Sequence, residues 1–74
     1  MPTFYIIAGV KIVLYFADHN PPHFHAIFAE YDALIAIETC EILEGDLPKT
    51  KRKKILEWAN EHKSELMEIW NDLN

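Results

Sequence analysis

The chain has 74 residues and a formal net charge of −5, which is enough for one small domain over residues 1–74. The negative charge disfavours nonspecific coating of nucleic acid, and no apolar run reaches the length of a membrane span. The single cysteine, Cys40, excludes an internal disulfide framework and fits a reducing compartment. The first residues lack the charged and apolar pattern of a secretory signal, so we expect a cytoplasmic protein.

The first half of the sequence predicts an antiparallel sheet over residues 3–43. Two runs of β-branched and aromatic residues, 4–7 and 10–16, flank Ala8-Gly9 and predict a hairpin, because Gly9 tolerates a positive φ. Further strands are predicted over 23–28 and 33–38, after a turn at 30–32, and a short fifth over 41–43. The second run is apolar on both faces, which a sheet covered on one face only would not need.

The last third of the sequence predicts a helix. Leu47-Pro48 opens it, with Asp46 as the expected N-cap, and no glycine or proline follows. Apolar residues recur at steps of four and three and form one stripe: Ile55, Ala59, His62, Leu66, Ile69 and Leu73. We predict one long helix over 48–73, bent near Asn60. The expected fold class is α+β, a four- to five-stranded antiparallel sheet with this helix packed on one face.

Half of the residues are hydrophobic, more than one small core hides comfortably. We therefore expect a homodimer or a complex with a small partner protein. Trp58 and Trp70 flank the apolar stripe of the helix. Stacking on bases is one interpretation, but tryptophans in such positions more often anchor a core or an interface between chains. His62 lies inside the stripe, and we expect it to be partly buried and hydrogen-bonded.

The segment Asp18-His19-Asn20-Pro21-Pro22-His23-Phe24-His25, called the histidine box below, holds three of the four histidines. Strand alternation puts His23 and His25 on one face, with Asp18 close in sequence. This pattern fits a metal-free acid/base pair that cleaves RNA, with Asp18 as the orienting group. The structural interpretation, a capped turn whose histidines bind backbone groups or line a subunit contact, carries more weight, because a motif alone is only a hypothesis.

Metal binding is a further interpretation of the histidine box. A His-x-His pair on a strand can supply two ligands, and Asp18, His19 or Glu38 can add others. Structural zinc usually takes four ligands, often cysteines, and this chain has no cysteine pair. We therefore expect no metal and no cofactor.

Five of the seven basic residues lie in one window at the start of the predicted helix: Lys49, Lys51, Arg52, Lys53 and Lys54. Cations oppose the dipole at a helix N-terminus, so such a window invites a functional reason. We expect Lys51 and Arg52, with Lys49, to hold phosphate or nucleic acid. The alternative is a solvated helix start with weak pairs such as Lys53–Glu57.

The order of these motifs resembles a family of small prokaryotic proteins catalogued as a domain of unknown function, number 4160. The resemblance rests on the histidine box after a hairpin, a Tyr-Asp-Ala-Leu-Ile strand, Glu-Ile-Leu-Glu-Gly-Asp-Leu-Pro and Glu-Trp-Ala-Asn-Glu-His-Lys-Ser-Glu-Leu. It implies a gene pair of the toxin–antitoxin kind but no catalytic assignment. Cys40 stands where we expect the family to favour glycine, and a positive φ there would cost about 1–2 kcal/mol.

Two functions follow as expectations. The first is a component of a toxin–antitoxin-like module that acts on or near RNA or protein partners, as a metal-free ribonuclease if it is an enzyme. The second is a non-catalytic binding module that forms a complex with the product of a neighbouring gene. The ribonuclease requires His23 and His25 to share one open hollow with Lys51 and Arg52.

Overall fold

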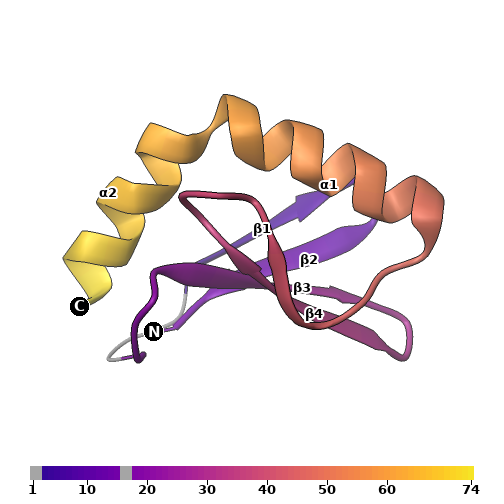
Figure 1. Cartoon of the computed structure of the whole chain (residues 1–74), viewed down its shortest axis with the longest axis horizontal. Coiled ribbons are helices and arrows are strands. Elements are labelled where there is room, and N and C mark those ends of the chain that lie inside the picture. Colours follow the sequence, from indigo (N-terminus) through magenta and orange to yellow (C-terminus); the bar gives the residue numbers. More distant parts are fainter. Residues whose placement is uncertain (1–2, 16–17) are drawn as a thin grey trace.

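The computed structural model describes residues 3–15 and 18–74 and shows an α+β fold. Five antiparallel strands pair in sequence order, and two helices follow (Figure 1). Neither helix combines the length and the apolar character that crossing a membrane requires. The elements are β1 (Thr3–Ile7), β2 (Val10–Leu14), β3 (His23–Phe28), β4 (Tyr31–Ala36), β5 (Ile42–Gly45), α1 (Lys49–Glu61) and α2 (Lys63–Leu73).

The core lies between the helices and one face of the sheet. Ile12, Ala26 and Ala33 are paired across three strands and are fully buried, so this row marks the covered face. Figure 1 shows α1 running over the sheet and α2 descending beside one end of it. The buried core comprises Val10, Ile12, Leu14, Phe24, Ala26, Ala33, Ile35, Ile37, Leu47, Ile55, Ala59, Leu66 and Trp70. The opposite face of the sheet, called the open face below, is covered by neither of the two described helices.

The prediction of one long helix is wrong, because the helical segment breaks at His62. His62 leaves helical geometry, with φ −116° and ψ 22°, and its ring Nδ1 lies 2.8 Å from the carbonyl oxygen of Trp58. Its backbone N–H is shared between Trp58 and Ala59, as at many helix ends. The break directs α2 toward the end of the sheet, where Leu66 and Trp70 are buried. His62 is half-buried and hydrogen-bonded, as expected.

Several predicted boundaries shift by one or two residues. The fourth strand begins at Tyr31 rather than at residue 33, and the fifth occupies Ile42–Gly45 rather than 41–43. The predicted end of the second strand, Phe16, lies outside the described residues. These shifts are typical, because element ends are set by pairing rather than by local composition.

Asp46 is not the N-cap that the sequence predicts. Pro48 holds that position, and no side chain caps the helix. The Asp46 carboxylate instead accepts hydrogen bonds from the backbone N–H of Leu47 at 2.8 Å and from Arg52 at 3.0 Å. These two contacts, the Leu47 bond first, lower the pKa of Asp46. Asp46 therefore stabilises the start of α1 through hydrogen bonds from a position that precedes the helix.

Left-handed backbone marks the tight turns. Ala8 and Ala29 have φ of 52°, and Cys40 has φ of 60° in the connection between β4 and β5. Cys40 was expected to be strained if its φ is positive, and its φ is positive. This conformation destabilises a residue other than glycine, because its Cβ comes too close to the backbone.

Gly45→Ala is expected to lower the free energy of unfolding by more than about 2 kcal/mol, through a positive φ and a steric clash. Gly45 has φ of +71°, and a Cβ there would collide with the carbonyl oxygen of Asp32 in β4. Gly9→Ala is the control, because its Cβ would lie at ordinary distances, 3.7 Å from Lys51 Nζ and 3.9 Å from Phe28. We expect the control to lose about 1 kcal/mol in urea unfolding, for φ alone. Equal losses would contradict the clash.

Cys40→Gly is expected to stabilise the fold by about 1 kcal/mol, because glycine adopts a positive φ without strain. Cys40→Ala keeps the Cβ and therefore the strain, so it should bring no gain. Chemical denaturation of both variants measures the difference. A gain of equal size in Cys40→Ala would show that the thiol, not the backbone, is unfavourable.

Candidate functional site

The histidine box gathers its side chains around one carboxylate. Asp18 Oδ2 lies 2.8 Å from Nε2 of His23 and 3.7 Å from Nε2 of His25. The other carboxylate oxygen, Oδ1, accepts the backbone N–H of His19 at 2.9 Å and lies 3.1 Å from the His19 ring. The three residues expected to act together, Asp18, His23 and His25, are therefore in contact.

Burial differs sharply between the two histidines of β3. His23 is 1% exposed, because the indole of Trp70 in α2 lies 5.1 Å from its ring and His19 lies 5.5 Å away. His25 is 22% exposed, and its ring forms a T-shaped contact with the ring of Tyr15, with the centroids 4.9 Å apart. His25 is thus the histidine of the pair that solvent reaches, whereas His23 is enclosed by the fold.

Hydrogen bonding assigns the tautomer of His23. Its Nδ1 lies 2.7 Å from the carbonyl oxygen of Pro21, which can only accept, so Nδ1 carries the proton. Nε2 is buried at 2.8 Å from Asp18 Oδ2, but the contact lacks the alignment of a hydrogen bond. Among the described residues, Nε2 of His23 is the one buried side-chain polar atom without a hydrogen-bond partner.

The Asp18 carboxyl has a lowered pKa. Burial acts in the opposite direction and is the largest single influence. The backbone N–H of His19 and the interactions with His23 and His19 together outweigh it. Asp18 is therefore a carboxylate at neutral pH, held by its histidine neighbours.

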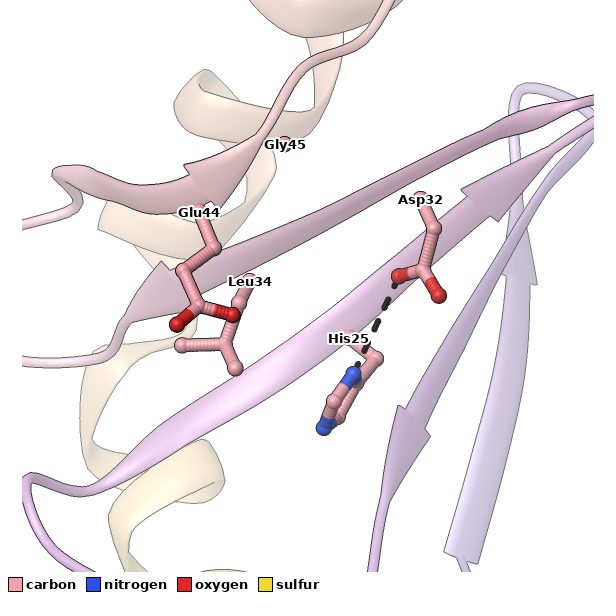
Figure 2. A pocket seen from close by; sticks show the side chains of 5 residues that line it. All are labelled: His25, Asp32, Leu34, Glu44 and Gly45. Carbon is pink, nitrogen blue, oxygen red and sulfur yellow. Dashed lines mark ion pairs between the residues drawn. The ribbon is translucent and has the colours of Figure 1, made fainter.

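A pocket of about 210 Å³ opens beside the histidine box (Figure 2). Its lining consists of His25, Asp32, Leu34, Glu44 and Gly45. His25 joins the pocket to the Asp18 cluster, because its Nδ1 lies 3.8 Å from Asp32 Oδ1 while its Nε2 faces Asp18. In Figure 2 the carboxylates of Asp32 and Glu44 lie on either side of the lining. This lining favours cations over phosphate groups.

The basic residues do not join the histidines. Lys51 Nζ donates to the carbonyl oxygen of Ala8 at 2.7 Å and lies over the ring of Phe28. Phe28 ends the strand that His23 begins, so the two lie roughly 16 Å apart along β3. Arg52 is paired with Asp46, and Lys49 is exposed at the start of α1. The shared hollow that the sequence predicted for histidines and cations is not formed.

The physical reason lies in the order of the strands. Gly45, which precedes the helix, pairs with Ala33 in the first half of β4, while His23 pairs with Ala36, the last residue of that strand. The start of α1 therefore emerges away from the histidine box. Without the strand register, the sequence does not show that the histidine box and the start of α1 lie apart.

The tryptophans lie inside the fold. Trp70 is buried in the core against His23, so the interface role expected for it is not available in the folded chain. Trp58 is half-buried and packs against Tyr5 and Phe24. The sequence analysis also allowed both tryptophans to pack in the core of the fold, and this is where Trp58 and Trp70 lie.

Asp32 and Glu44 are the site residues that sequence reasoning missed. The prediction placed Asp32 in a turn, which left the direction of its side chain unassigned. The true register pairs Ile27 with Asp32 and Leu34 with Glu44, which puts both carboxylates on the face of His25. If the fourth strand had been predicted to begin at residue 31, alternation would have placed the side chain of Asp32 on the face of His25.

Comparison with known proteins places the chain in a family. No curated protein and no solved structure matches it. A family model described as a domain of unknown function, DUF4160, matches residues 9–71, which include the histidine box, the acidic pocket and most of both helices. Since this match extends over most of the 74 residues, the chain belongs to the DUF4160 family.

Proposed function

We propose that this protein is a non-catalytic binding module of a toxin–antitoxin-like pair. In this proposal it docks the small protein encoded beside it against the open face of its sheet. The observation that carries the proposal is the apolar character of that face. Strand alternation places there five apolar side chains, namely Ile6, Val13, Tyr15, Ile27 and Leu34.

Two of these side chains are strongly exposed. Ile6 is 67% exposed on the edge strand β1, and Tyr15 is 40% exposed beside His25. Fully burying an isoleucine side chain is worth about 1.5–3 kcal/mol, so a partner that covers Ile6 gains appreciable affinity. Exposed apolar side chains that share one face of a sheet are typical of a binding surface.

The charges on the open face define the chemistry of the partner. Asp32 and Glu44 flank the apolar residues on one side, and Lys11 is the only lysine or arginine in the described strands. A second copy of the chain would bring mostly the same negative charge to this face. A different protein that presents apolar residues beside lysine or arginine fits better.

A metal-free ribonuclease receives less support from the geometry. The presumed acid/base pair includes a histidine that is enclosed by Trp70 and His19, and the neighbouring pocket is lined by carboxylates. Lys51 and Arg52 are engaged elsewhere, with Ala8 and Asp46. RNA would therefore meet negative charge where it needs phosphate contacts.

Ile6→Glu is expected to weaken the complex with the neighbouring gene product at least tenfold, because a carboxylate would replace an apolar anchor. Ile6 pairs with Lys11 across the strands, so a glutamate there leaves the sheet stable. Tyr31→Glu is the matched control, because Tyr31 is 39% exposed but alternates toward the helix side. Calorimetric titration of the purified pair gives the affinities. Binding unchanged in Ile6→Glu, or self-association in place of that complex, would overturn the proposal.

The purified chain is expected to leave a single-stranded RNA intact in the presence of EDTA. The reason is the carboxylate lining beside His25, which repels the backbone phosphates. Gel analysis of the RNA tests this expectation. Cleavage that disappears in His25→Gln would instead establish the ribonuclease.

A further inference from the structure

The geometry points to a binding site for one divalent transition-metal ion, formed by Asp18, His23 and His25. The inference goes beyond the docking proposal and does not rest on it, because it is argued only from the ligand atoms of these three side chains, which border the open face. Ligand atoms of the three side chains all lie within 4.8 Å of one another. Two imidazole nitrogens and one carboxylate oxygen are a donor set that suits zinc and its first-row neighbours rather than magnesium or calcium.

The first argument is the buried Nε2 of His23. The proton of this ring is on Nδ1, which donates to Pro21, so Nε2 of the neutral ring is a bare lone pair. That lone pair faces the anionic Oδ2 of Asp18 at 2.8 Å, without the alignment of a hydrogen bond. Two acceptors in such close contact repel each other unless a positive charge, either a second ring proton or a metal ion, lies between them. A metal ion bound to both atoms would remove the repulsion and satisfy Nε2.

The second argument is the surroundings of the two rings. Metal-binding histidines usually donate their second ring N–H to a carbonyl or a carboxylate, which fixes the tautomer. His23 makes this contact with Pro21 at 2.7 Å, and Nδ1 of His25 lies 3.8 Å from Asp32. Both rings thus present Nε2 toward Asp18 and Nδ1 toward an outer acceptor.

The third argument is the fit. Ligand atoms about 2.0–2.1 Å from a tetrahedral zinc ion are about 3.3 Å apart. The two observed nitrogen-to-oxygen distances, 2.8 and 3.7 Å, lie on either side of that value. All three ligand atoms lie within 4.8 Å of one another, so forming the site requires the two ring nitrogens to approach by no more than about 1.5 Å. Asp18 is held on its other oxygen by His19, which leaves Oδ2 directed at the rings.

Access and selectivity also follow from the site. His25 is partly exposed and lines the acidic pocket, so an ion can enter past Asp32 and Glu44, which attract cations. Three protein ligands leave one coordination position for water or another ligand, as in open zinc sites. The proposed ion is therefore exchangeable and reachable from the open face.

The experiment is a titration of the chain, purified without a histidine tag and stripped with EDTA, with Zn²⁺ in a calorimeter. We expect one ion per chain, with no comparable binding of Mg²⁺. His25→Gln and Asp18→Asn are expected to weaken binding at least tenfold, since each removes one of three ligands. Neither ligand is in the buried core, so both variants should fold. Asp72→Asn is the matched control for Asp18→Asn, because Asp72 is exposed on α2 and is not one of the three proposed ligands.

A second readout is the long-range nitrogen NMR spectrum of the imidazoles. Zn²⁺ should shift the Nε2 resonances of His23 and His25 and leave their Nδ1–H groups protonated. Absence of saturable binding would overturn the inference. So would binding that survives both ligand substitutions, or that falls equally in Asp72→Asn, since the loss would then not be specific to the three proposed ligands.

Discussion

The fold depends on one constraint: a single C-terminal segment must cover one face of a five-stranded sheet. Alternation buries most of the side chains that β2, β3 and β4 direct to that face, and these side chains need a second layer. A straight helix would cross the sheet and leave its end open. The break at His62 solves this problem, because α2 then brings Trp70 to the end of the sheet where β3 begins.

The same constraint determines the chemistry of the site. Trp70 encloses His23, and Pro21 binds its Nδ1, so the carboxylate of Asp18 faces the second ring nitrogen, Nε2, at 2.8 Å. His25, two residues along the strand, remains partly open and faces the acidic pocket. One strand thus holds a buried and an accessible histidine against one carboxylate. The basic start of α1 stabilises the far hairpin turn instead, through Lys51.

Local patterns in the sequence predicted most of the fold. The hairpin at Ala8-Gly9, the strand at 23–28 and the apolar stripe of the helices follow from alternation and from steps of three and four, and the structure confirms them. The sequence predicted a bend near Asn60 but not the end of one helix at His62, because the break involves a side chain that binds the Trp58 carbonyl and the apolar stripe continues through it. The contact of Asp18 with the histidines followed from sequence proximity. The pocket did not, because Asp32 and Glu44 arrive through the register of β4 and β5.

Each tryptophan of this chain lies against a histidine: Trp70 is 5.1 Å from the ring of His23, and Trp58 stacks on His62 at 5.1 Å. An excited indole transfers an electron to a charged imidazole more readily than to a neutral one, so its emission dims when the ring is charged. The intrinsic fluorescence of the folded protein therefore reports the charge state of two histidines, and a change in emission with acidity need not signify loss of structure.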